Sequence, residues 1–114
     1  METINVYVKE RGRNLIRAEI DPASFQSVVG GEVLVLPFFN GTCCVVNKEK
    51  NKRGNRSEHT CTLLGVDLFG TVIFAGCSDY SCRYSDMPID LDRFKYRFPT
   101  IDNPDPGKIE RARS

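Results

Sequence analysis

Two apolar segments on either side of the dipeptide Asn40-Gly41 constrain the fold most strongly. Residues 32–38, Glu-Val-Leu-Val-Leu-Pro-Phe, are almost continuously apolar, and residues 42–46, Thr-Cys-Cys-Val-Val, follow the dipeptide. Asn-Gly is a strong signal for a tight turn between antiparallel strands, so we predict a β-hairpin. Because the first segment has no polar alternation, we expect it to be a central strand, with Pro37 near its end.

The N-terminal segments predict a second hairpin followed by a helix. Residues 4–8 alternate apolar and polar side chains, and residues 15–20 can return as the partner strand. Asp21–Pro22 is typical of a helix start, and Gly30–Gly31 supplies a left-handed stop. We therefore predict a short helix over residues 22–29.

The C-terminal half predicts two more strands and an ambiguous element. Residues 60–64 indicate a short strand, and residues 70–76 indicate a buried strand bounded by glycines. Residues 87–98 predict a short helix that Asp86 caps, because acids lie early and bases late in this segment. Its helical period is imperfect, so a strand over residues 94–98 is the alternative.

Length and element order together predict one domain. The chain has 114 residues, of which 40% are apolar, enough for a single hydrophobic core. Hairpin connections dominate, so we expect a single α+β domain over residues 1–98. It would contain a mainly antiparallel sheet with one or two short helices. The segment 99–114 is rich in proline and charge and is predicted to be a flexible tail.

Charge and cysteine content exclude several classes of protein. Lys and Arg number 16 and Asp and Glu 15, and this balance argues against a long nucleic acid as partner. No segment has the roughly 20 apolar residues of a membrane span, and the start of the chain lacks a signal-peptide pattern. We expect a cytoplasmic protein without membrane contact. Its five cysteines would then be free thiols.

The residues capable of catalysis or metal binding form no recognised motif. His59, the only histidine, lies two positions from Cys61, but no orienting acid is evident. Four residues separate Cys77 from Cys82, a poor match to structural zinc sites. There is no phosphate-binding glycine loop. We therefore assign no catalytic residue, no metal site and no cofactor.

Two basic segments are candidates for ligand binding. Residues 47–58 contain no apolar side chain and are predicted to be a long exposed loop, functional or simply solvated. Residues 93–98 alternate cations with aromatic rings, which as a strand would place all three cations on one face. The alternative is an edge strand with an apolar inner face. The candidate ligand-binding residues are Asn47, Lys48, Lys52, Arg53, Asn55, Arg56, Arg93, Lys95 and Arg97.

These candidates favour a small anionic ligand. Arginine can hold a phosphate with two hydrogen bonds, and asparagine can read a base edge or a ribose hydroxyl. Rings to stack on a base are available at four positions, although such rings more often pack in the core: Phe38, Phe39, Tyr80 and Tyr84.

Four segments of the chain resemble a domain of unknown function found in small proteins of tailed bacteriophages and conjugative elements. Residues 28–37 resemble its Val-Gly-Gly segment with the following strand, and residues 47–49 resemble its Asn-Glu motif. Residues 54–56 resemble its Gly-Asn-Arg loop, and residues 66–76 its Gly-Thr strand. Lys48 stands where that family usually has an acid. The resemblance covers about residues 4–76 and implies a mobile-element origin and an intracellular life, without an activity.

The resulting functional prediction is a non-enzymatic phage or mobile-element protein that binds a small phosphate-bearing ligand. We expect it to sequester a nucleotide signal of host antiviral defence, in the host cytoplasm if the chain is phage-encoded. The alternative is a protein–protein interaction module that inhibits or modulates a host enzyme or effector. A nucleic-acid accessory protein and a hydrolase are weaker alternatives. An apolar sheet with few helices to cover it also favours a homo-oligomer.

Overall fold

The computed structural model describes residues 2–39, 41–77 and 83–102. Its strands are β1 (Ile4–Lys9), β2 (Ile16–Ile20), β3 (Val33–Pro37), β4 (Thr42–Asn47), β5 (His59–Leu63), β6 (Val66–Phe69), β7 (Val72–Cys77) and β8 (Tyr84–Ser85). Its helices are α1 (Phe25–Val29), α2 (Lys48–Arg53) and α3 (Leu91–Arg97), with 3-10 turns at Pro22–Ser24 and Arg56–Glu58.

The fold is α+β, as predicted, and every strand pairing is antiparallel. The main sheet has the order β2-β1-β7-β4-β3, with β8 paired to β7. Strands β5 and β6 form a separate hairpin. The predicted hairpins β1–β2 and β3–β4 are both confirmed, and the buried strand predicted over residues 70–76 is β7 at the centre of the sheet.

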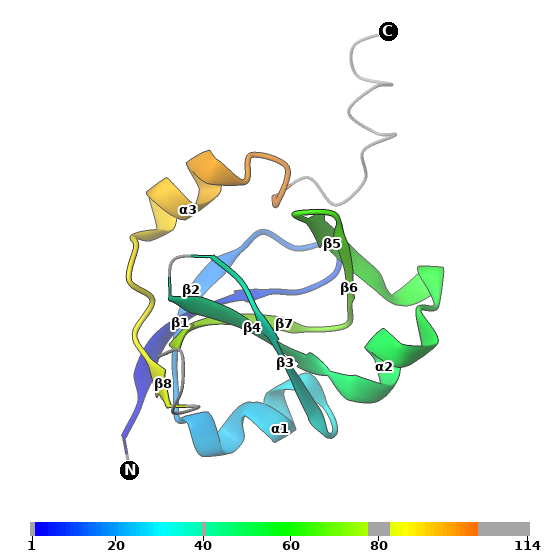
Figure 1. Cartoon of the computed structure of the whole chain (residues 1–114), viewed down its shortest axis with the longest axis horizontal. Helices are drawn as coiled ribbons and strands as arrows, with labels where there is room; N and C mark the ends of the chain where they lie inside the picture. The colour runs from blue at the N-terminus through cyan, green and yellow to red at the C-terminus, as the bar shows by residue number, and fades with distance from the viewer. Residues whose placement is uncertain (1, 40, 78–82, 103–114) are drawn as a thin grey trace, which may run out of the picture.

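The main sheet buries both of its faces (Figure 1). On one face, α1 covers a cluster that includes Val6, Val45 and Ile73. On the other face, α3 and the β5–β6 hairpin cover a larger cluster that includes Phe74 and Phe94. Because side chains alternate between the faces, neighbouring residues of β4 such as Cys43 and Cys44 belong to different clusters. The main sheet therefore lies between two hydrophobic clusters, one on each face.

The helix predicted over residues 22–29 is confirmed. It begins with a 3-10 turn whose N-cap is Asp21, where a carboxylate oxygen accepts a hydrogen bond from the Ala23 amide at 3.0 Å. It continues as α1 and ends at Gly30, whose φ of 81° is the left-handed conformation that glycine adopts without steric cost. Phe25 and Val29 point into the sheet.

The prediction of a central position for residues 32–38 is wrong, because β3 is an edge strand of the sheet. Leu34 and Leu36 pack against the cluster beneath α3 and the β5–β6 hairpin, and Val33 packs against the cluster beneath α1, while Val35 is 39% exposed. A continuous apolar pattern therefore does not report the number of neighbouring strands. Pro37 is tolerated here because an edge strand needs amides on one side only.

The long loop predicted over residues 47–58 is also wrong. Residues 48–53 form α2, and residues 56–58 form a 3-10 turn. Asn47 caps α2 by accepting a hydrogen bond from the Lys50 amide at 2.9 Å, and Gly54 ends it at a φ of 62°. The polar residues that suggested a loop are the start and stop signals of a helix without a buried face.

The segment 86–98 contains a helix, so the alternative strand over residues 94–98 is wrong. The N-cap of α3 is Asp90, which accepts a hydrogen bond from the Arg93 amide at 2.8 Å. Asp86, the predicted cap, instead accepts a hydrogen bond from the Asn5 amide at 2.8 Å. Asp86 thereby holds the segment that precedes α3 against β1.

Packing continues past residue 98, where the flexible tail was expected to begin. Ile101 is buried in the core cluster beneath α3. Asp102 accepts a hydrogen bond from the Leu15 amide at 2.6 Å and forms an ion pair with Lys95 at 2.8 Å. The first four residues of the expected tail therefore pack on the domain, and the remainder lies outside the described residues.

Candidate functional site

The cations of the 47–58 segment are mostly held in surface ion pairs. Lys48 lies 3.2 Å from Glu32, and Arg53 lies 3.2 Å from Glu58. Arg56 lies 3.2 Å from Asp67 and also contacts the Phe69 ring, 5.9 Å from its centroid. Each ion pair neutralises the charge of a cation that was predicted to bind a ligand. Within the described ranges, Lys52 is the cation of this segment without an ion pair.

The asparagines of the same segment have structural roles. Asn47 is buried, and besides capping α2 it donates a hydrogen bond to the Val29 carbonyl at 3.1 Å. Asn55 caps the 3-10 turn by accepting from the Ser57 amide at 3.1 Å. Asn51 exchanges two hydrogen bonds of 3.0 Å with the backbone of Phe69. Asn51 thus holds α2 against the β5–β6 hairpin, while Asn47 and Asn55 cap the helical turns of their own segment.

The three cations of α3 do not share one face. Successive residues of a helix are about 100° apart, so Arg93 and Arg97 lie on one side and Lys95 on the other. Lys95 pairs with Asp102, and the guanidinium of Arg97 lies 4.8 Å from the centroid of the Phe39 ring. The predicted strand with three parallel cations is therefore replaced by a helix that divides them.

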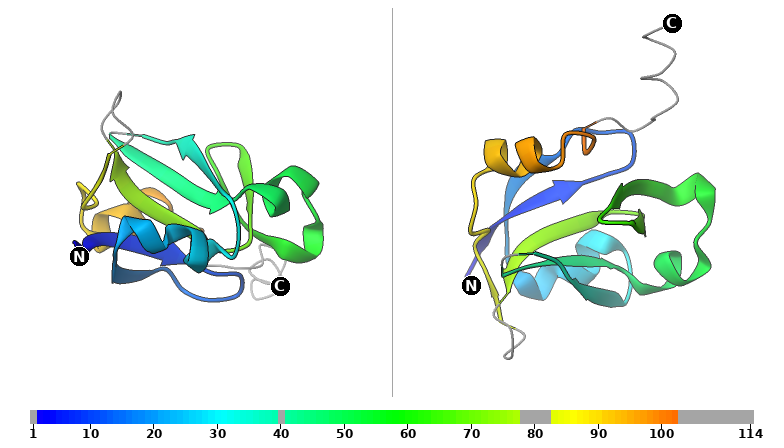
Figure 2. Two further views of the ribbon diagram at one scale, coloured as in Figure 1. Left: turned by 90° about the horizontal axis from the view of Figure 1, so that it is seen from below. Right: turned by 45° about the horizontal axis from the view of Figure 1, so that its top comes forward.

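The two predicted basic clusters do not form a common site. Figure 2 shows α2 and α3 on different sides of the molecule in both views.

The aromatic rings proposed to stack on a base pack against other rings of the domain instead. Phe38 and Phe39 contact each other and Phe98, with centroid distances of 5.0 to 5.2 Å, and Tyr84 packs on Phe25 at 4.9 Å. Tyr80 lies outside the described residues.

A small polar hollow, which the sequence did not indicate, lies beside α2. It has a volume of about 240 Å³, and its lining comprises Arg11, Lys50, Ser57, Glu58, Gly70 and Thr71. Arg11 donates a hydrogen bond from Nε to the His59 carbonyl at 3.1 Å, and Lys50 lies 3.6 Å from Glu58. Two cations therefore face one carboxylate and two hydroxyl groups. Arg11 escaped prediction because it is far from α2 in the sequence.

His59 and Cys61 have separate environments. Nε2 of His59 lies 3.0 Å from Thr62 Oγ1 and 3.1 Å from Asp67 Oδ1, on the outer surface of the hairpin. Cys61 points into the core, and burial raises the pKa of its thiol to about 11. The side chains of Thr62 and His59 and the guanidinium of Arg56 hold the pKa of Asp67 below its usual value.

The described cysteines are core or partly buried residues, and none forms a disulfide bond. Cys43, Cys44 and Cys61 are buried, while Cys77 is partly exposed and Cys82 lies outside the described residues. Over the ranges that the structure describes, no three histidine, cysteine or acidic side chains are grouped as metal ligands would be. Burial also raises the pKa of Cys43 to about 12.

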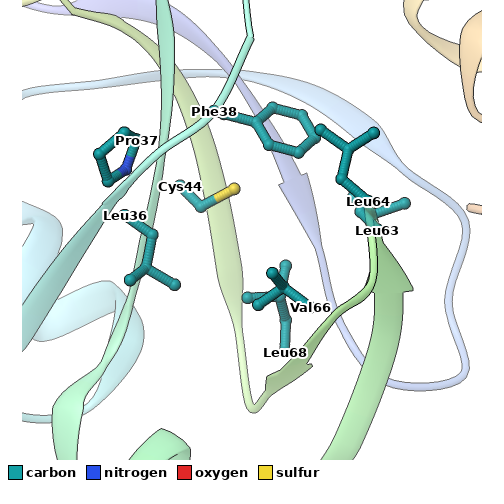
Figure 3. Close-up of a pocket in the computed structure, with 8 residues that line it drawn as sticks. All are labelled: Leu36, Pro37, Phe38, Cys44, Leu63, Leu64, Val66 and Leu68. Atoms are coloured by element: carbon teal, nitrogen blue, oxygen red, sulfur yellow. The ribbon is translucent and has the colours of Figure 1, made fainter.

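An apolar hollow, which we call the groove, lies between β3–β4 and the β5–β6 hairpin. Its volume is about 190 Å³, and its lining comprises Leu36, Pro37, Phe38, Cys44, Leu63, Leu64, Val66 and Leu68. Figure 3 shows Leu36, Phe38 and Cys44 on one side of the groove and the hairpin leucines with Val66 on the other. Leu64 and Val66 are 63% and 48% exposed, so the hairpin side is open to solvent.

Leu64 has an unusual backbone at the tip of the hairpin. The turn joins Leu63 to Val66 through two residues with positive φ, 50° at Leu64 and 77° at Gly65. Such turns favour Asn or Gly at both positions, whereas leucine there costs about 1–2 kcal/mol. Because Leu-Gly is not a typical turn dipeptide, the sequence analysis did not predict this turn. It therefore did not predict β6 or the groove either.

A comparison with known protein families places most of the chain in one family. A family model described as "Domain of unknown function (DUF3846)" matches residues 4–98, which is more than half of the chain. The chain belongs to the DUF3846 family. No curated protein and no solved structure matches it. The match extends beyond residue 76, where the resemblance in the sequence was expected to end.

The DUF3846 match includes the groove and the polar hollow. Every residue that lines either of them lies between Arg11 and Thr71. Ile101 and Asp102, which pack beneath α3, lie just beyond the match. None of the helices over the described residues of this DUF3846 chain is both long enough and apolar enough to span a membrane.

Proposed function

We propose that this DUF3846 chain is a non-catalytic protein-interaction module, in which the groove binds apolar side chains from an extended segment of another protein. The observation that carries the proposal is the exposed apolar groove with Leu64 at its rim. Large apolar side chains that are open to solvent at a concave surface are typical of protein-docking sites.

The dimensions of the groove support a side chain as its occupant. Small-molecule pockets usually measure about 300–1,000 Å³, and a groove of about 190 Å³ falls below that range. Its lining has no charged side chain that could hold a phosphate. A single apolar anchor residue of a partner, as at the hot spots of protein interfaces, fits both the size and the chemistry.

The backbone of Leu64 supports the same proposal. A strained residue that asparagine or glycine would relieve is retained where its side chain has a use. Leu64 is too exposed to contribute much to the core, at 63%. A binding role explains both the exposure and the strain.

The origin suggested by the sequence gives the proposal a biological setting. We place the chain in a bacteriophage or conjugative element, acting on a protein of its host in the host cytoplasm. The resemblance of four segments to proteins of such elements supports this setting. The partner would be a host enzyme or effector that exposes an extended apolar segment.

A displayed library of random peptides tests the proposal directly. We expect selection on the full chain to enrich peptides with large apolar residues at alternate positions. Leu64→Asn should weaken binding of a selected peptide by about tenfold or more, since an exposed anchor contact is removed. The same substitution should leave the free energy of unfolding unchanged or higher, because asparagine tolerates positive φ.

Ile16→Asn is the matched control. Ile16 is 57% exposed on β2, at the opposite edge of the sheet, so its replacement should leave peptide affinity unchanged. Equal affinity of Leu64→Asn and the wild type would contradict the proposal. Enrichment of peptides without apolar residues would contradict it as well.

The small phosphate-bearing ligand is the second candidate. The polar hollow, at about 240 Å³, is also smaller than a usual small-molecule pocket, so it would take the phosphate group and leave the rest of the ligand outside. We propose that Arg11 and Lys50 would hold the phosphate there, with hydrogen bonds from Ser57 and Thr71. A thermal-shift screen with cyclic nucleotides, ADP-ribose and mononucleotides tests this. A ligand at about 100 times its Kd should stabilise the chain by roughly 2.7 kcal/mol, or several degrees.

Substitutions locate any such ligand. Arg11→Gln should abolish the thermal shift, while Arg17→Gln on exposed β2 should preserve it. The loss of shift in Lys52→Gln with Arg11→Gln unaffected would instead return the site to the outer face of α2. The absence of a shift with every compound would eliminate this second candidate.

A further inference from the structure

The free edge of β3 has a proline only at its end, Pro37, and no charged side chain, in contrast to the other edge of the sheet. Natural edge strands are usually blocked by charged side chains, by proline or by bulges. Strand β2 carries exposed Arg17 and Glu19, whereas β3 is apolar from Val33 to Leu36 and has Val35 39% exposed. The part of this edge from Val33 to Leu36 is therefore open to pairing with another strand.

The hydrogen-bonding groups of β3 show which residues are available to that strand. Phe38 donates to the Thr42 carbonyl, and the Glu32 carbonyl accepts from Lys48. Because antiparallel pairs alternate, the even-numbered residues of β3 bond to β4, and the N–H and C=O groups of Val33 and Val35 point away from it. Within the described ranges, nothing pairs with these four groups. Pro37 has no N–H to offer.

We infer that a second copy of the chain covers this edge, by antiparallel pairing of β3 with β3 about a two-fold axis at Leu34. In this register Val33 of each copy exchanges two hydrogen bonds with Val35 of the other. Pro37 then lies outside the ladder, so its missing N–H costs nothing. The register is self-complementary, as an isologous interface requires. The net charge of +1 also gives the copies little reason to repel.

The dimer enlarges the groove on which the proposed function rests. A two-fold axis perpendicular to a continuous sheet keeps both grooves on the same face. Strand β3 borders the groove opposite the hairpin (Figure 3). The grooves of the two copies therefore lie on either side of the β3–β3 pairing, which we call the seam. Together they form one apolar trough, with a floor of four strands about 4.8 Å apart and a β5–β6 hairpin as each wall. The partner copy thus supplies half of the docking surface.

Sedimentation velocity of the full chain, from micromolar to millimolar concentration, tests the dimer. The seam is short, so we expect reversible dimers of micromolar Kd. Val35→Lys places like charges close together across the seam and should raise the Kd at least about tenfold. An equimolar mixture of Val35→Lys and Val35→Glu should restore dimers. Ile16→Lys, the same change on the opposite edge, should not affect them.

Three results decide between the dimer and the proposed function. A wild-type chain that stays monomeric while binding a selected peptide would overturn the dimer and leave the groove proposal standing. A dimer that Val35→Lys leaves intact, with unchanged thermal unfolding, would show that another surface pairs and would also overturn the inference. A dimer with the predicted charge response that binds no selected peptide would support the inference and contradict the proposed function.

Discussion

Replacing Phe94 by alanine is expected to lower the free energy of unfolding by about 3–5 kcal/mol. Phe94 is fully buried and is the buried residue of α3, packed in the cluster that lies on the sheet. Its ring centroid lies 4.9 Å from that of Phe74, 5.2 Å from that of Phe98 and 5.6 Å from that of Tyr7. Alanine would leave a cavity among these rings. Urea denaturation followed by circular dichroism measures the loss.

Tyr96→Ala is the matched control for this prediction. Tyr96 is on the same helix but is 88% exposed, so its loss should change the free energy of unfolding by less than about 0.5 kcal/mol. Similar effects of the two substitutions would contradict the packing of α3 on the sheet. Since Phe38 also stacks on Phe98 at 5.2 Å, Phe94→Ala should further weaken peptide binding in the groove.

Raising the pH from 7.5 to 10 is expected to lower the free energy of unfolding by about 3–4 kcal/mol. Burial raises the pKa of Cys61 to about 11 and that of Cys43 to about 12, and it also raises the pKa of Cys44 above its ordinary value of 9.0. The unfolded chain therefore releases these protons first. At pH 10, one unit above 9.0, each thiol costs between about 1 and 2 kcal/mol.

The sign and window of this pH effect follow from the raised pKa values. Stability from the thiols is complete below pH 9 and is lost as the pH rises toward their folded pKa values. Lys9 acts in the opposite direction, because burial lowers its pKa from 10.5 and the folded chain binds its proton less tightly. Lys9 is a single group and the thiols are three, so the free energy of unfolding still falls as the pH rises.

Urea denaturation across this pH range, repeated with Cys61→Ala, checks the assignment. The variant should lose about a third less stability between pH 7.5 and 10. Lys9→Met should lose more than the wild type, since the opposing group is gone. Equal stability of the wild type at the two pH values would mean that the thiols are not buried as described.

Local sequence signals predicted the elements whose boundaries are set by local chemistry. Asp21–Pro22 and Gly30 delimited the first helix, and the Asn-Gly dipeptide marked the β3–β4 hairpin. The same kind of signal was misread at Asn47 and Gly54, which cap α2. A helix that buries none of its residues has no apolar periodicity, so its caps were its only signal.

The site was harder to predict because it depends on pairing between distant residues. The cations at Lys48 and Arg56 suggested a ligand, but Glu32 and Asp67 neutralise them across the fold. The edge position of β3 depends on the sheet order, which a single strand does not encode. Leu64 lies in a turn with positive φ, a conformation that leucine disfavours. Tertiary contacts thus decided which of these side chains are paired within the domain and which are open to solvent.

Amide chemical-shift mapping with a selected peptide tests the central claim that the groove is the binding surface. Spectra of the full chain, recorded at increasing peptide concentration, should show the largest changes at Leu36, Leu63, Leu64 and Val66. Shifts confined to Arg11, Lys50 and Ser57 would contradict the groove and assign binding to the polar hollow.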